Sequence, residues 1–138
     1  MRRKVVLVTF LYTHCPDVCP VIANNLNAAL RLLAPADRAR TRVFAVSLDP
    51  AHDGPSEVRR FIAEHRLLPQ FRYLTGSRAT LQPVWQAYNV IAAPRNDTAI
   101  DHSAYTTLVD RRGIAQVYFD STSPPADIAH DVRRALAN

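Results

Sequence analysis

The sequence predicts an α/β protein in which helices cover both faces of a mixed central β-sheet. Strand-like runs alternate with segments of helical periodicity in the order βαβαβα, and two further strand-like runs and a last helix follow. The first three strands should be joined by crossovers, and the last two should pair antiparallel as a hairpin. At 138 residues the chain is predicted to be one domain, spanning residues 1–138.

The first half of this pattern opens with "KVVLVTFLY" at residues 4–12, which is apolar on both faces, as a buried central strand should be. A helix is predicted over residues 21–34 and should be closed by Pro35. Its apolar positions recur at helical spacing: Val21, Leu26, Leu30 and Leu33. Residues 41–49, "TRVFAVSLD", are the second buried strand, ended by Asp49-Pro50.

The middle of the chain continues with a helix over residues 56–67, whose first turn suits Pro55 and whose apolar stripe is Val58, Phe61 and Ile62. A short strand is expected at residues 71–75. Ser77 should then cap a helix over residues 78–90, in which Pro83 lies close enough to the start to be tolerated. Its inward positions are predicted to be Leu81, Val84, Trp85 and Tyr88.

The last part of the chain begins with a poorly patterned stretch, residues 91–104. Strands are predicted at residues 105–110 and 114–120, joined by Arg111-Arg112-Gly113 in the manner of a hairpin. A final helix covers residues 124–137, with one apolar side made of Ile128, Val132 and Leu136.

The composition excludes several classes of protein. The net charge of +5 is carried by scattered arginines, with Lys4 as the one lysine, so nucleic acid is not expected as a partner. No run approaches the roughly 18 apolar residues of a membrane span. The first residues lead straight into a strand-like run without a small-residue cleavage site, so we expect no secretory leader there. Two cysteines do not make a disulfide scaffold in a domain of this size.

Those two cysteines stand together in "LYTHCPDVCP", where the first strand gives way to the first helix. Open α/β sheets place binding sites at the carboxyl ends of their strands. The spacing of Cys15 and Cys19 puts both sulfurs on one face of a helix, near an N-terminus that favours thiolates. Asp17 opposes a second and third negative charge, and a bound cation would remove that conflict. A structural disulfide, a redox dithiol, a metal clamp and two buried apolar cysteines are the alternatives.

Two thiolates need a third ligand to make a closed metal site, and the chain holds five histidines. His65 and His130 lie in helices and are expected to be solvated or satisfied locally. His14 would need a sharp bend to share a metal with Cys15, and His52 lies in a turn-forming loop on the same sheet edge. His102 ends the unpatterned stretch just before a strand, and is either a ligand or an ordinary loop histidine.

Two thiolates and one imidazole form a soft ligand set that selects copper(I) over magnesium or calcium. Zinc is the rival ion, because thiolate and imidazole also suit it. A structural zinc site would need a fourth ligand. The candidates for that position are Asp49, Asp53 and water.

Four segments in this order resemble the SCO/SenC family: "VVLVTFLYTHCPDVCP", "AVSLDPAHDGP", "YLTGS" and "DHSAYTTLVDRRG". The resemblance runs from about Lys4 to the C-terminus. It implies a thioredoxin-like fold and a copper protein that helps metallate the dinuclear copper centre of cytochrome c oxidase. By position, Cys15 and Cys19 match the family's thiolate ligands and His102 its histidine ligand. The loop with Asp49 and Asp53 matches the family's aspartate loop, which implies a role in docking or in a transient copper(II) state.

The same resemblance implies the protein's setting. The expected partners are the copper-site subunit of the oxidase and other copper carriers, and the expected cargo is Cu(I), Cu(II) or both. Family members carry a membrane anchor and a strand pair before the matching region, and this chain has neither. We therefore expect the working protein to be periplasmic or on the outer face of the inner membrane, held by a segment that this chain does not contain.

We interpret the chain as a copper-binding assembly protein rather than an enzyme with turnover. The main rival is a thiol–disulfide oxidoreductase that reduces the cysteines of the oxidase copper site, with Cys15 as attacker and Cys19 as resolver. That chemistry has no use for His102. A peroxide-reducing enzyme of thioredoxin fold is a third, weaker alternative, because its peroxidatic cysteine usually lies in another motif.

Overall fold

One mixed sheet organises the computed structural model, which describes residues 4–16, 18–90 and 105–138. The strand order across it is β3-β2-β1-β4-β5. The strands are β1 (Val5–Leu11), β2 (Thr41–Ser47), β3 (Phe71–Leu74), β4 (Tyr105–Val109) and β5 (Ala115–Asp120). β2 pairs in parallel with β1 and β3, whereas β4 is antiparallel to both β1 and β5. The predicted parallel strands and the antiparallel hairpin are thus confirmed.

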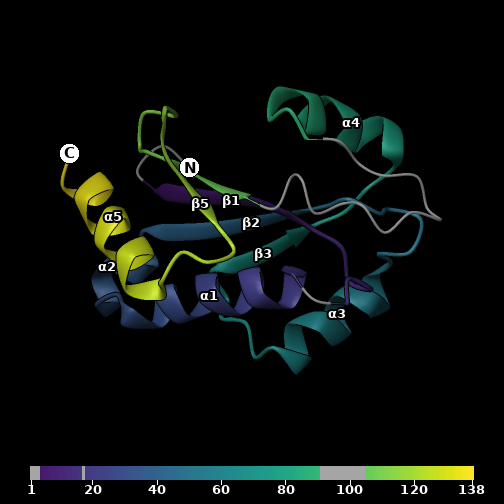
Figure 1. The fold of residues 1–138 in the computed structure, drawn as a ribbon, viewed down its shortest axis with the longest axis horizontal. Helices are drawn as coiled ribbons and strands as arrows, with labels where there is room; N and C mark the ends of the chain where they lie inside the picture. The colour runs from purple at the N-terminus through teal and green to yellow at the C-terminus, as the bar shows by residue number, and fades with distance from the viewer. Residues whose placement is uncertain (1–3, 17, 91–104) are drawn as a thin grey trace.

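Helices cover both faces of this sheet, as predicted (Figure 1). The helices are α1 (Val18–Leu32), α2 (Pro35–Ala39), α3 (Pro55–Glu64), α4 (Arg78–Ala87) and α5 (Pro125–Ala137). Side chains alternate along β1, so that Leu7 and Leu11 pack with α1, α3 and α5. Val8 and Phe10 face the other way, into a smaller cluster with Leu81 and Trp85 of α4.

The first helix starts three residues before its predicted boundary, at Val18 instead of Val21. The prediction that Val21 is a core residue is wrong, since that side chain is 46% exposed and Ile22 fills the inward position. Pro35 was expected only to end this helix, but it also begins α2 at a position where its missing N–H costs nothing. The guanidinium of Arg38 then donates to the carbonyl groups that close α1, those of Leu30, Arg31 and Leu33.

The turn between β4 and β5 has the geometry that its sequence requires. Gly113 adopts a φ of +84°, which a side chain would disfavour, and its N–H donates to the Asp110 carbonyl. The Asp110 carboxylate accepts from the backbone N–H groups of Arg112 and Ile114. The expected hairpin is confirmed.

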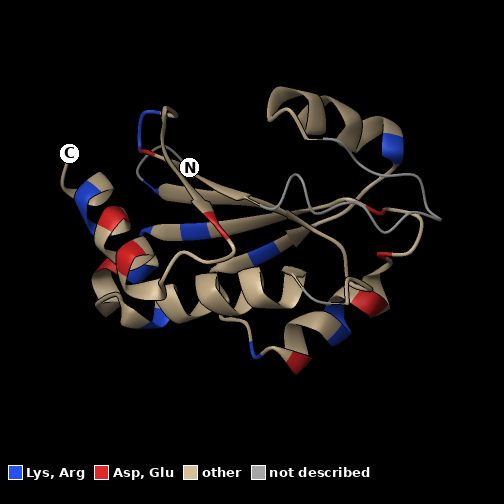
Figure 2. Ribbon diagram, in the orientation of Figure 1, with Lys and Arg blue, Asp and Glu red and all other residues tan. Residues whose placement is uncertain are grey.

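Charged residues are spread over helices, strands and the β4–β5 hairpin, with both signs present on α5 (Figure 2). None of the helices within residues 4–16, 18–90 and 105–138 is long and apolar enough to cross a membrane.

Candidate metal centre

The two cysteines lie at the carboxyl end of β1. Cys15 is in the loop that precedes α1, and Cys19 is the second residue of that helix. The expectation that one helical face carries both is wrong, because Cys15 comes before the first residue of the helix. Their sulfurs are nevertheless kept together, since the backbone N–H of Cys19 donates to Sγ of Cys15 over 3.3 Å. Both side chains are buried, and no disulfide joins them.

The surroundings of Cys19 favour the thiol over the thiolate. Its hydrogen bond with Cys15 raises the pKa of the Cys19 thiol most, followed by burial and by the negative charges of Cys15 and Asp53. A backbone hydrogen bond from Tyr12 lowers this pKa but does not offset the rest. The neighbouring sulfur and burial thus oppose, at Cys19, the effect expected of the helix N-terminus. The proton of Cys19 must leave before its sulfur acts as a ligand or nucleophile.

A buried carboxylate connects the cysteine loop to the sheet. Asp53 is 1% exposed and accepts four hydrogen bonds through its two oxygens. Oδ1 accepts from the backbone N–H of Thr13 over 2.9 Å and from its hydroxyl over 2.7 Å. Oδ2 accepts from Ser47 over 2.7 Å and from Tyr73 over 3.1 Å. One side chain thus binds the loop after β1, the end of β2 and strand β3.

The topology of the sheet explains why Asp53 lies next to the cysteine loop. The parallel pairing of β1 with β2 puts their carboxyl ends at one edge of the sheet, so the two following loops meet (Figure 1). Burial and the charge of Asp53 raise the pKa of the Tyr73 phenol, which therefore stays protonated and able to donate. The sequence analysis proposed Asp53 as a fourth metal ligand or as a docking residue, and it missed the partners of this carboxylate: Thr13, Ser47 and Tyr73. A tyrosine two residues after the buried Phe71 in a short strand was the available signal, since a buried hydroxyl needs a partner.

The remaining polar residues of these two loops are at the surface. The Asp49 carbonyl accepts from the N–H groups of His52 and Asp53, which is the turn that the sequence indicated. The Asp49 carboxylate lies 2.9 Å from Nδ1 of His52. His14 is directed to Glu57, with 3.7 Å between Nε2 and Oε2.

The other histidines fall in three places. The ring of His65 packs against Phe61, and His130 is on the exposed side of α5, as expected for both. His102 lies outside the described residues. Within the described part of the chain, no group of three or more His, Cys, Asp or Glu side chains is close enough to hold an ion together.

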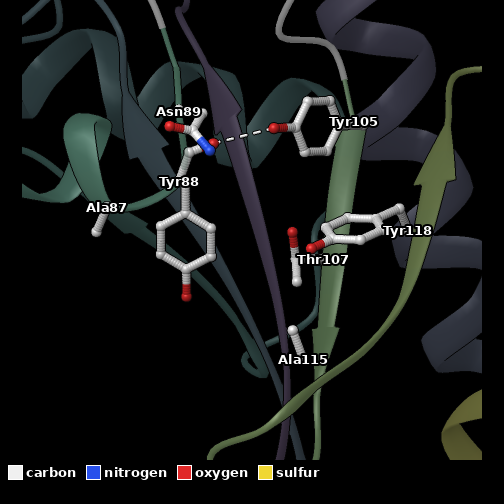
Figure 3. Close-up of a pocket in the computed structure, with 7 residues that line it drawn as sticks. All are labelled: Ala87, Tyr88, Asn89, Tyr105, Thr107, Ala115 and Tyr118. Atoms are coloured by element: carbon white, nitrogen blue, oxygen red, sulfur yellow. Dashed lines mark hydrogen bonds between the residues drawn. The ribbon is translucent and has the colours of Figure 1, made fainter.

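A separate hollow of about 380 Å³ opens between the end of α4 and strands β4 and β5 (Figure 3). The hydroxyl of Tyr105 donates across it to the Tyr88 carbonyl over 2.9 Å. The described residues that line it are Ala87, Tyr88, Asn89, Tyr105, Thr107, Ala115 and Tyr118. Neither cysteine is among them, so this aromatic hollow is not part of the dithiol site.

The donor set at the end of β1 suits a soft metal ion. Both cysteines belong to the buried hydrophobic core and offer sulfur, whereas magnesium and calcium require several oxygen donors. Asp53, a buried carboxylate whose charge acts on Cys19, already accepts four hydrogen bonds, so its oxygens are engaged within the protein. The same pair of thiols can also exchange with a disulfide.

Comparison with known proteins finds a match between the family model described as SCO1/SenC and residues 1–137. Protein SenC of Rhodobacter capsulatus is 33% identical over 130 residues, which cover 91% of this chain and 58% of that protein. The chain thus spans less than two thirds of the length of this relative.

Two solved structures resemble the fold closely. The structure of Bradyrhizobium japonicum ScoI with copper bound is 31% identical, with a TM-score of 0.80, covering 96% of this chain and 85% of that one. The SCO1/SenC family lipoprotein from Bacillus anthracis is 25% identical, with a TM-score of 0.80, covering 99% of this chain and 83% of that one. The thioredoxin-like fold expected from the sequence is confirmed.

Proposed function

This chain belongs to the SCO1/SenC family, and we propose that it is a copper-binding assembly protein that delivers copper to, or prepares, the dinuclear copper centre of cytochrome c oxidase. The observation that carries the proposal is the 3.3 Å contact between the Cys19 N–H and the Cys15 sulfur, which keeps two soft donors together. The copper-bound ScoI of Bradyrhizobium japonicum, at 31% identity, supports the choice of metal.

In this proposal Cys15 and Cys19 hold copper as thiolates and His102 completes the site. The strand that follows His102 supports its inclusion. β4 runs antiparallel to β1, with Val8 opposite Thr107, so Tyr105 begins β4 at the end of the sheet from which the cysteine loop leaves.

Copper would enter the reduced dithiol and leave by exchange of ligands with the cysteines of a partner. Each thiol that becomes a ligand releases its proton, so binding is favoured by higher pH. The partners are the copper-site subunit of the oxidase and other copper carriers. A location of the whole protein in the periplasm or on the outer face of the inner membrane is consistent with the lipoprotein relative from Bacillus anthracis.

The variant His102→Ala tests the ligand set. The expected result is a loss of copper(I) affinity of ~10–100-fold in competition with a chelator, since one ligand is removed. His130→Ala is the matched control, because His130 is on the exposed side of α5 and should leave affinity unchanged. Equal affinity in His102→Ala and wild type contradicts the assignment of His102.

A thiol–disulfide oxidoreductase is the second candidate, favoured by the adjacency of two thiols that no disulfide joins. Cys15 would attack a partner disulfide as a thiolate. Cys19 would then displace the mixed disulfide, which leaves the partner reduced and a Cys15–Cys19 disulfide behind. Two quantities measured in the same variants distinguish the two functions: copper(I) affinity and the rate of exchange with a disulfide peptide. An assembly protein needs His102 for copper, whereas a reductase keeps its full function in His102→Ala and loses it in Cys19→Ser.

A further inference from the structure

Two exposed histidines lie next to each other on the surface beside the dithiol. His14 follows β1 and His52 follows β2, and their ring centroids are 6.2 Å apart with the ring planes at 90°. The side chains are 57% and 56% exposed, so a hydrated ion can reach both and each ring can rotate. Neither residue has a role in the copper(I) ligand set of Cys15, Cys19 and His102.

A carboxylate lies near one ring nitrogen of each histidine. Nδ1 of His52 lies 2.9 Å and 3.1 Å from the two carboxylate oxygens of Asp49. A carboxylate only accepts, so Nδ1 carries the hydrogen, and Nε2 of the neutral ring keeps its lone pair. Carboxylates hold metal-binding histidines in this way, which fixes the tautomer and makes the ligating nitrogen more basic. Oε2 of Glu57 lies 3.7 Å from Nε2 of His14.

The protein holds these two histidines together without help from a metal. Thr13 and Asp53, their immediate neighbours in sequence, are joined by hydrogen bonds of 2.9 Å and 2.7 Å. The turn at Asp49 is closed by the N–H groups of His52 and Asp53. Because the loops are already fastened, an ion that bridges the rings orders only two side chains and no backbone.

We propose that His14 and His52 form a second metal site, which binds a divalent first-row ion and prefers Cu²⁺. Imidazole nitrogens suit copper, zinc and nickel, and affinity among these ions is greatest for copper. Two imidazole nitrogens on one ion, each at ~2.0–2.1 Å, are at most about 4 Å apart. Each ring centroid lies behind its nitrogen, so centroids 6.2 Å apart are compatible with a shared ion. Asp49 and Glu57 add negative charge close to it.

The site has two protein ligands, and water completes the coordination of the ion. No larger group of potential ligands occurs within residues 4–16, 18–90 and 105–138. Exchange at such an exposed site is fast, which suits capture of an ion at the surface. This second site goes beyond the proposed copper(I) function and does not depend on it.

The test uses the full chain with the proposed copper(I) ligands removed, Cys15→Ser/Cys19→Ser/His102→Ala, titrated with Cu²⁺ and followed by calorimetry and electron paramagnetic resonance. The expected result is one bound Cu²⁺ with nitrogen ligands. Adding His14→Ala or His52→Ala should weaken binding at least 10-fold, and Asp49→Asn should weaken it by ~10-fold. If the serine background fails to fold, Cys15→Ala/Cys19→Ala/His102→Ala replaces it, since both cysteines are buried.

The matched control is His130→Ala in the same background, which removes an exposed histidine of α5 and should leave Cu²⁺ binding unchanged. Unaltered binding in the His14→Ala/His52→Ala background overturns the proposal, as does an equal loss in His130→Ala. Because the thiols and His102 are absent throughout, neither result bears on whether the dithiol carries copper(I).

Discussion

Asp53 and Thr13 are joined by two hydrogen bonds to one carboxylate oxygen, from the backbone N–H over 2.9 Å and from the hydroxyl over 2.7 Å. Thr13 is two residues before Cys15, and Asp53 ends the turn that follows β2. The position of the first cysteine relative to the sheet therefore depends on a carboxylate that lies 40 residues after Thr13 in the chain. We call Asp53 and its donors Thr13, Ser47 and Tyr73 the Asp53 cluster.

Neutralising this carboxylate should loosen the cysteine loop. In Asp53→Asn an amide NH₂ group, which cannot accept a hydrogen bond, replaces one of the two carboxylate oxygens. Each buried donor that is left unpaired lowers the stability of the protein by ~1–3 kcal/mol. We expect a loss of at least ~2 kcal/mol in the free energy of unfolding in urea, together with weaker copper(I) binding. Glu64→Gln, which neutralises an exposed carboxylate of α3, is the control and should stay within ~0.5 kcal/mol of wild type. Wild-type stability in Asp53→Asn would contradict the structural role of the cluster.

Removing the hydroxyl group of Tyr73, the donor that β3 contributes, is a second test of the Asp53 cluster. Tyr73→Phe keeps the ring contact with Phe61 but removes the 3.1 Å hydrogen bond to Asp53. Because the acceptor is charged, we expect a loss of about 1.5–3 kcal/mol in urea. Tyr73→Leu should cost more, since it also removes the ring.

The same tyrosine predicts a pH dependence. Burial and Asp53 raise the pKa of Tyr73 above its value in the unfolded chain. The resulting stabilisation is fully present below pH ~10 and is lost as the pH rises above that. Wild type should therefore lose stability more steeply than Tyr73→Phe between about pH 10 and 12, measured by thermal unfolding. Parallel curves for the two proteins would show that Tyr73 ionises freely in the folded state.

Two buried threonines in the sheet allow a comparison between a buried hydroxyl that has a hydrogen-bond partner and one that has none among the described residues. Both Thr9 and Thr41 are 0% exposed. Thr41 donates to the Asp37 carbonyl over 2.8 Å, whereas the Thr9 hydroxyl has no partner among the described residues. Thr9→Val should therefore stabilise the protein by ~1 kcal/mol, and Thr41→Val should destabilise it by about the same amount. The opposite signs in urea denaturation are the check, and a loss in both variants would mean that Thr9 has a partner.

Much of the fold was predictable from sequence because local signals agreed with tertiary packing. The strand at residues 41–49 and the hairpin at Gly113 were recognisable from β-branched runs and turn chemistry. Ser77 caps α4 as predicted, by accepting from the N–H of Thr80 over 3.1 Å. The error at Val21 arose because Val21 and Ile22 are adjacent apolar residues, and the spacing alone did not show that Ile22 is the one that faces the core.

The candidate site was predictable only in part. The cysteine spacing and the strand-to-helix position pointed to the correct edge of the sheet. In the Asp53 cluster, the contacts of Asp53 with Tyr73 and Thr13 join residues 20 and 40 positions apart, which no local pattern reports. Its carboxylate looked like an ordinary turn residue because the turn is real, and only the burial of the side chain reveals its other partners.

The Asp53 cluster also affects the order in which the protein can acquire its site during folding. Its donors come from the loop after β1, from β2 and from β3, so it forms only after two parallel crossovers have closed. Such long-range pairings form slowly, because the entropy of loop closure is lost before the contacts compensate for it. Until then Cys15 and Cys19 are exposed on a partly folded chain. The newly made protein therefore passes through a period in which its thiols are open to oxidation.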